Sequence, residues 1–96
     1  MVAYAYMLRC SDGHYYVGST TAALEARVGQ HNAGHYGGWT ARRRPVTLVW
    51  HQEFQRVEDA IAAERKLKGW SRAKKEALIV VNYPRIRALA GRSSKG

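Results

Sequence analysis

Apolar residues dominate the start of the chain, over residues 2–10. An apolar run of this length, bounded by turn residues, is typical of a buried β-strand. Ser11-Asp12-Gly13 follows as a turn signal, because glycine accepts a positive φ and aspartate can bond to its own backbone. Residues 14–19 form a second strand-like run, so the pattern predicts a β-hairpin.

A helical pattern follows the hairpin, with Leu24 and Val28 four residues apart on one face. Thr20 or Thr21 can N-cap this helix, since a hydroxyl can accept a hydrogen bond from a free N–H of the first turn. We therefore expect a helix over about residues 22–33.

The second half of the chain shows a loop, a strand and two further helices. Residues 34–44 are rich in glycine and then in arginine, which indicates a loop. Strand-forming residues fill 46–54, and a helix with acidic residues in its first turn is expected at about 56–69. Ser71 is the expected N-cap of a short helix that reaches Val81.

The chain of 96 residues fits one domain, which we expect over residues 1–90, followed by a flexible basic tail over residues 91–96. No run approaches the roughly 20 apolar residues of a membrane span, and we expect no signal peptide. Cys10 is the single cysteine, which excludes an internal disulfide. These features predict a cytoplasmic protein that is not inserted in a membrane.

The charge of the chain is unevenly distributed. Sixteen basic residues face seven acidic ones, which gives a net charge of +9, and the whole excess lies in residues 42–96. Such a field attracts polyanions, nucleic acid first and anionic lipid second. A basic protein that is merely soluble is the simpler alternative.

Glu64 is a carboxylate in an apolar setting. It lies three residues after Ile61 and three before Leu67, on the inward stripe of the expected helix. An unpaired buried charge is costly, so this carboxylate needs a partner. The partner is either an arginine, in a structural salt bridge, or a divalent cation, for which a carboxylate is a natural ligand.

Four other residues can take part in chemistry. Arg27 and His31 are four residues apart and project from one helical face. The arginine is either tethered to a carboxylate or bound to a phosphate, and the histidine is either a hydrogen-bonded core residue or a proton carrier. Tyr6 and Tyr16 lie in the expected strands, where packing is the commoner role of tyrosine.

Basic residues gather in two runs, and a tryptophan accompanies each of them. Trp39 lies beside the first run and Trp70 within the second. Aromatic and basic residues together suit phosphate neutralisation with base stacking, although basic runs are often only solvated faces. The expected nucleic-acid contacts are Arg42, Arg43, Arg44, Lys68, Arg72, Lys74 and Lys75.

Other chemistries lack their motifs. Neither the P-loop pattern nor the dinucleotide-binding glycine pattern occurs in the sequence. No HExxH and no paired Cys–His metal spacing occurs either.

Several ordered motifs resemble the GIY-YIG nuclease family, in particular its small single-domain bacterial-type members. Tyr4-Ala5-Tyr6 stands in the place of the GIY triplet, and Tyr16-Val17-Gly18 stands in the place of YIG. The match covers about residues 3–82 and continues through Gln30-His31-Asn32-Ala33-Gly34, Thr40-Ala41-Arg42-Arg43-Arg44-Pro45-Val46, Glu64 and Lys68-Gly69-Trp70-Ser71-Arg72.

The resemblance implies an α+β fold in which helices flank a three-stranded antiparallel sheet. It also implies hydrolysis of a DNA phosphodiester with one divalent cation, Mg²⁺ or Mn²⁺. Glu64 would hold the cation, which polarises the phosphate and steadies the leaving oxygen. Arg27 would bind the phosphate. Tyr6 is the favoured acceptor of the proton from the attacking water, with His31 receiving that proton onward.

The resemblance also places Tyr16 in the catalytic set and gives supporting parts to Gly18 and Asn82. Tyr16 would orient water or phosphate, Gly18 would let the backbone approach closely, and Asn82 is a candidate for the asparagine that often follows the metal-binding glutamate. Tyr4 and Ala5 depart from the glycine and isoleucine of the family triplet, which leaves Tyr6 unchanged.

The leading hypothesis is a metal-dependent DNA endonuclease. Because the chain has no separate recognition domain, we expect it to prefer single-stranded or branched DNA. The first alternative is a nucleic-acid-binding module of the same fold with weak or no catalysis. Another is a basic interaction domain completed by a protein partner or by a second copy in a homodimer.

Overall fold

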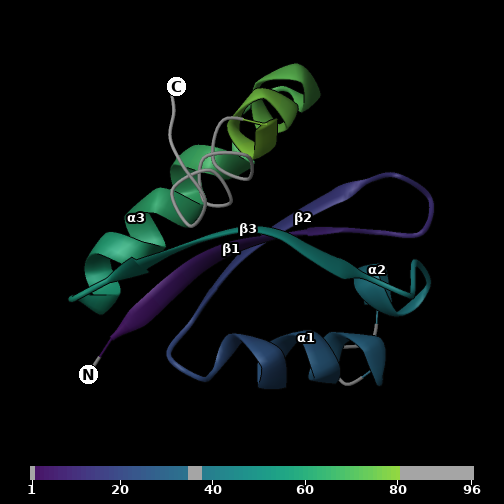
Figure 1. Ribbon diagram of the computed structural model, residues 1–96, viewed down its shortest axis with the longest axis horizontal. Coiled ribbons are helices and arrows are strands. Elements are labelled where there is room, and N and C mark those ends of the chain that lie inside the picture. Colours follow the sequence, from purple (N-terminus) through teal and green to yellow (C-terminus); the bar gives the residue numbers. More distant parts are fainter. Residues whose placement is uncertain (1, 35–37, 81–96) are drawn as a thin grey trace, which may run out of the picture.

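Three strands form an antiparallel sheet in the computed structural model of the protein, which describes residues 2–34 and 38–80 (Figure 1). Strand β1 (Ala3–Arg9) lies in the centre, between β2 (Tyr15–Thr20) and β3 (Thr47–Phe54). Both pairings are antiparallel. The predicted sheet is therefore confirmed, with strand bounds that differ by about one residue from those expected.

The hairpin turn between β1 and β2 has the chemistry that the sequence predicts. Gly13 has a φ of 89°, a conformation that a Cβ atom disfavours and glycine adopts freely. Asp12 Oδ1 accepts a hydrogen bond from the backbone N–H of His14 at 3.1 Å. These two features close the turn and set the register of the two strands.

The central strand is buried on both faces of the sheet, which explains its nearly continuous apolar sequence. Its side chains alternate, so Ala5 and Met7 face one side, and Tyr6 and Leu8 face the other. The first face packs in a cluster of Ala5, Met7, Val17, Trp50 and Leu67. The second face packs in a cluster of Tyr6, Leu8, Cys10 and Val46, against which Leu24 and Val28 lie.

Helices cover the two faces of the sheet separately. Helix α1 (Leu24–Asn32) and the short α2 (Gly38–Ala41) lie on the Tyr6 face, and α3 (Val57–Lys68) lies on the opposite face (Figure 1). A further helical segment covers residues 72–80. Within the described part of the chain, no helix is long and apolar enough to cross a membrane.

The predicted N-cap of α1 is wrong. Ala23 is the capping residue and makes no side-chain hydrogen bond to the helix. The hydroxyl of Thr20 instead accepts a hydrogen bond from the N–H of Ala22 at 2.9 Å. The threonine therefore closes the turn that leaves β2, and the helix begins at Leu24, two residues later than expected.

The other boundaries agree with the prediction where the structure describes them. The N–H of Lys74 donates to Ser71 Oγ at 3.2 Å, as expected for an N-cap. The expected loop over residues 34–44 contains the α2 turn, which the glycine-rich sequence did not indicate. The expected helix end at Val81 and the basic tail over residues 91–96 lie outside the described residues.

Candidate active site

Tyr6, His31 and Thr40 form a hydrogen-bonded row beneath α1. The Tyr6 hydroxyl lies 3.1 Å from His31 Nε2, and His31 Nδ1 lies 3.1 Å from Thr40 Oγ1. The three side chains come from β1, α1 and α2, and all are buried. A histidine bonded at both ring nitrogens has a fixed orientation. The geometry shows the first of the two roles considered for His31, a hydrogen-bonded core residue. Its role as a proton carrier stays a prediction.

The pKa of His31 lies below its ordinary value. Burial of the ring is the larger cause, and the positive charge of Arg27 acts in the same direction. Arg27 lies one helical turn before His31 on α1, so its guanidinium is close to the ring. The imidazole is therefore neutral near pH 7, with one nitrogen able to accept a proton.

Tyr16 and Gly18 lie next to this row on the edge strand β2. The Tyr16 ring centre lies 5.0 Å from that of His31 and 6.4 Å from that of Tyr6. Gly18 is the cross-strand partner of Tyr6. A Cβ atom at Gly18 would lie 2.6 Å from the Tyr6 hydroxyl, so only glycine leaves room for the phenol.

Glu64 reaches the same edge of the sheet from α3, on the opposite face. Its Oε1 accepts a hydrogen bond from Ser19 Oγ at 2.5 Å, and its Oε2 pairs with Lys68 Nζ at 2.7 Å. The expected partner was an arginine or a cation, and the structure shows a lysine one turn along the helix. The pKa of Lys68 is raised chiefly by its hydrogen bond to Glu64, and Tyr16 acts on it in the same direction.

Opposing effects set the pKa of the Glu64 carboxyl. Burial alone would raise this pKa, but hydrogen bonds from Lys68 and Ser19 and the charges of Lys68 and Arg65 outweigh burial. The pKa therefore lies below its ordinary value, and the group is a carboxylate at neutral pH.

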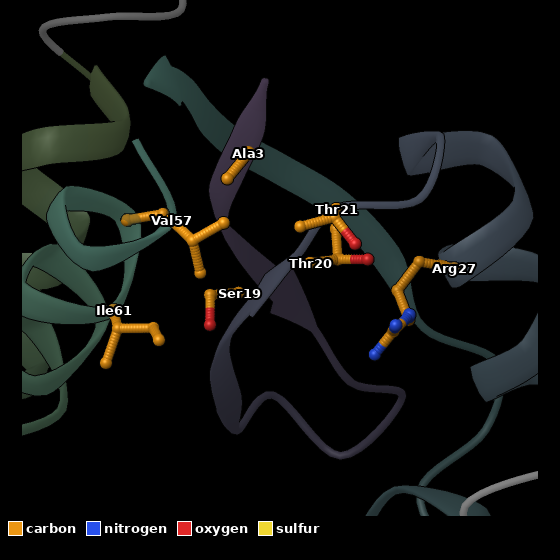
Figure 2. Close-up of a pocket in the computed structure, with 8 residues that line it drawn as sticks. Ala3, Ser19, Thr20, Thr21, Arg27, Val57 and Ile61 are labelled. Atoms are coloured by element: carbon orange, nitrogen blue, oxygen red, sulfur yellow. The ribbon is translucent and has the colours of Figure 1, made fainter. Parts of the chain in front are cut away.

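A cavity of about 260 Å³ lies between α1 and α3 at the β2 edge. Figure 2 shows Arg27 approaching it from α1, with the hydroxyls of Ser19 and Thr20 between that arginine and Ile61 on α3. Ser19, which bonds Glu64, is thus a wall of the same cavity as Arg27. A phosphate-sized group in this cavity would meet a cation and two hydroxyls.

Glu64 offers one carboxylate to a hard divalent cation, at a position where Lys68 is paired with its Oε2. In residues 2–34 and 38–80, no three His, Cys, Asp or Glu side chains are grouped closely enough to hold a metal by themselves. Mg²⁺ is commonly bound by one or two carboxylates, with water and substrate phosphate supplying the other ligands. Glu64, with the hydroxyl of Ser19 beside it, offers this kind of donor set.

The three arginines after α2 have different surroundings. Arg43 Nε pairs with Asp12 Oδ2 at 3.0 Å, and its guanidinium carbon lies 4.1 Å from the Trp39 ring centre. Arg44 Nε donates to a main-chain carbonyl at 2.7 Å. Arg42 is exposed and makes no hydrogen bond or ion pair with the residues that the structure describes. Arg42 is therefore the member of this run most available to a ligand.

The basic residues of the second run also differ in their contacts. Arg72 donates to the carbonyl of Gly13 at 2.7 Å, pairs with Glu76 at 3.1 Å and lies over the ring of Tyr15. It thus ties the helical segment of residues 72–80 to the hairpin. Lys74 lies over Trp70, with 4.7 Å between Nζ and the ring centre.

Ser19 and Thr40 were missed by sequence reasoning as parts of the site, whereas Trp39 was expected only as an aromatic neighbour of the first basic run. Ser19 directly follows the Tyr16-Val17-Gly18 triplet, and strand alternation could have shown that it faces away from Tyr16. Thr40 and Trp39 belong to the short α2, which no pattern indicates. Trp39 is 38 % exposed and lies 6.2 Å, centre to centre, from Tyr16.

A three-stranded antiparallel sheet with α1 on one face and α3 on the other has counterparts among known proteins. A family model described as the GIY-YIG catalytic domain matches residues 2–77, and the chain belongs to this family. GIY-YIG domains are typically endonucleases, they generally use divalent metal ions, and membership implies a nucleic-acid substrate.

Relatives within the family are similar over most of the chain. A UPF0213 protein of Lacticaseibacillus paracasei is 43% identical over 76 residues, which are 79% of this chain and 84% of the relative. The UPF0213 protein of Halobacterium salinarum is 44% identical over 78% of this chain and 96% of its own. The solution structure of a Bacillus halodurans UPF0213 protein is 35% identical, covers 85% of this chain and 86% of its own, and superimposes with a TM-score of 0.55.

The close approach of Tyr6 to Gly18 predicts the effect of adding one methyl group. Gly18→Ala should lower the free energy of unfolding by about 1–3 kcal/mol, because the Tyr6 phenol must move. Gly29→Ala is the matched control: nothing lies within 4 Å of its Cβ position, and alanine should stabilise the interior of α1 by about 0.5–1 kcal/mol. Urea unfolding of both variants measures the effects, and equal stability would contradict the steric assignment.

The lowered pKa of His31 predicts a loss of stability in weak acid. The unfolded chain binds a proton at this residue near pH 6.5, before the folded chain does, so protonation favours unfolding. The free energy of unfolding should therefore fall as pH decreases below about 6.5, by at most about 1.4 kcal/mol per pH unit from this group. His31→Gln should make the free energy of unfolding depend less on pH, as measured by urea titrations between pH 5 and 8. If the variant shows the same dependence on pH as wild type, His31 is not the group responsible.

Proposed function

We propose that the protein is a metal-dependent DNA endonuclease whose site comprises Tyr6, Tyr16, Arg27, His31 and Glu64. The observation that carries this proposal is the hydrogen bond between Tyr6 and the neutral His31. The helix of His31 also brings Arg27 to a cavity whose wall includes Ser19, and Ser19 bonds the Glu64 carboxylate. A base, an anion-binding group and a metal-binding carboxylate thus approach one edge of the sheet.

The Tyr6–His31 pair provides a path for one proton. When the single ring proton of His31 is on Nδ1, the Nδ1–H group donates a hydrogen bond to Thr40 Oγ1. Nε2 is then free to accept a hydrogen bond from the Tyr6 hydroxyl. Tyr6 can then take a proton from the attacking water while its own proton passes to His31. A phenol with an ordinary pKa of about 10 is a weak base at neutral pH, so this transfer is what makes it useful.

The remaining groups bind and orient the phosphate. Arg27 enters the cavity from α1, where a guanidinium can hold two phosphate oxygens and the charge that develops on them. Glu64 would hold the divalent cation, which when bound polarises the phosphate and stabilises the leaving oxygen. Tyr16 lies beside His31 and would orient water or phosphate, and Gly18 keeps the space for Tyr6 open.

Trp39 supports a preference for single-stranded or branched DNA. Its ring is partly exposed, the guanidinium of Arg43 covers one side, and Tyr16 of the site lies beside it. An exposed aromatic ring can stack on a nucleobase only when that base is not paired within a duplex. The exposed Arg42 and Lys74 would neutralise the backbone.

A nucleic-acid-binding module with weak or no catalysis is the second candidate. The observation in its favour is that Ser19 and Lys68 satisfy both oxygens of Glu64, as they would for a purely structural carboxylate. Three other predictions remain as they stand: a partner subunit or homodimer, a cytoplasmic location, and the role of Asn82, which lies outside the described residues.

Cleavage assays on pure protein test the leading proposal. We expect cleavage of labelled single-stranded and branched DNA with Mg²⁺ or Mn²⁺ and none in EDTA. Glu64→Ala should reduce cleavage to background while DNA binding survives, because the phosphate contacts come from other residues. Glu58→Ala is the matched control, an exposed carboxylate on the same helix.

Two outcomes separate the candidates. Binding of DNA without cleavage under every metal condition would support the binding module. Equal cleavage by wild type and by Glu64→Ala would contradict the assignment of this carboxylate.

The exposed ring predicts a measurable substrate preference. Trp39→Ala should weaken binding to a single-stranded oligonucleotide by about 5- to 100-fold, the range expected for loss of one stacked base. Duplex binding should change little. Fluorescence anisotropy in EDTA measures both affinities, with Val80→Ala, which changes an exposed apolar side chain elsewhere, as the control. An equal loss on both substrates would argue against stacking.

A further inference from the structure

Lys68 lies where the cation of the proposed nuclease would bind. Its ammonium contacts Glu64 Oε2 at 2.7 Å, and among the described residues the other hydrogen bond to this carboxylate comes from Ser19, at Oε1. A divalent cation bound to Oε2 cannot share this position with an ammonium, because the two charges repel each other and occupy the same space. Binding of the cation therefore requires that Lys68 leaves.

The two partners of the ion pair differ in exposure. The Glu64 side chain is 18 % exposed, whereas the Lys68 side chain is 53 % exposed. A carboxylate in this position is costly without a partner. An ammonium on a long, half-exposed chain can return to water at little cost. The ion pair can therefore be broken by movement of the Lys68 side chain into solvent, while Glu64 stays in place.

Ser19 keeps the carboxylate in place during this exchange. Its hydroxyl bonds the other oxygen, Oε1, from the neighbouring strand β2. The carboxylate plane therefore does not depend on Lys68 alone.

We propose that Lys68 is an exchangeable counter-ion: it neutralises Glu64 in the metal-free protein and is displaced when the divalent cation binds. This inference rests on the proposed function for the cation itself. It adds a competition that neither the family match nor the sequence motifs describe. In this role Lys68 is a positioning residue that acts through Glu64.

Metal affinity without DNA tests the competition directly. Mn²⁺ binding is titrated by following the electron paramagnetic resonance signal of free Mn²⁺. Lys68→Met should bind Mn²⁺ about three- to tenfold more tightly than wild type, because the cation no longer displaces an ion pair. A residue with only a structural role would show the opposite change, since its loss damages the site.

Arg65→Met is the matched control, because Arg65 lies on the same helix and its charge acts on Glu64 without a hydrogen bond. It should change the affinity by less than about twofold, as expected for a screened charge. An equal gain in both variants would overturn the proposal, because general charge would then explain it. An unchanged affinity of Lys68→Met, with wild type binding Mn²⁺, would also overturn it.

Chemical labelling of lysine amines provides a second measurement on the wild-type protein. Addition of Mn²⁺ should raise the acetylation rate of Lys68 severalfold relative to that of Lys66, as the ammonium leaves Glu64. A rate that does not change at saturating Mn²⁺ would contradict displacement. If wild type and Glu64→Ala bind Mn²⁺ equally weakly, the proposed metal site fails, which is distinct from failure of the exchange.

Discussion

The pairing of Tyr6 with Gly18 across the first two strands is the constraint on which the site depends. Side chains alternate along a strand, so this one pairing places both phenols on the α1 face and Ser19 on the α3 face. A slip of one residue would turn the Tyr6 hydroxyl away from His31. Gly13 and Asp12 close the turn that sets this register.

The position of β2 at the edge of the sheet allows the site to draw on both faces. One half contains the neutral pair of Tyr6 and His31, which is buried under α1. The other half contains the charged pair of Glu64 and Lys68, which is partly open to solvent. Burial keeps the first half uncharged, and charge-assisted hydrogen bonds keep the second half ionised. The β2 edge thus lies between a buried, neutral environment on the α1 face and a partly exposed, ionised environment on the α3 face.

The sequence predicts those features that depend on local periodicity. The hairpin, the three strands and the inward position of Glu64 follow from spacing and turn residues, and the membership of the GIY-YIG family follows from the ordered motifs. Contacts between distant segments could not be predicted in this way. Ser19 meets Glu64 across 45 residues of chain, and Thr40 meets His31 through a short helix within a segment whose glycines predict a loop.

Thr20 shows why the ends of helices are hard to predict from local sequence preferences alone. Thr20 satisfies the usual preference for an N-cap, yet its oxygen is used by a turn that precedes the helix. The choice between these partners depends on how the chain leaves the sheet, which periodicity does not report. Basic residues pose the same problem, because Arg72 and Arg42 look alike in sequence and only one of them is held by the fold.

The contacts of Arg72 have a consequence for where the catalytic unit ends. This side chain joins the carbonyl of Gly13 to Glu76, and Glu76 in turn accepts a hydrogen bond from the Tyr15 hydroxyl at 3.2 Å. The helical segment of residues 72–80 thus holds the tip of the hairpin that carries Tyr16. A truncation at the end of α3 would remove that support, although it would retain every proposed catalytic side chain. The contacts that hold the hairpin tip therefore extend through Glu76.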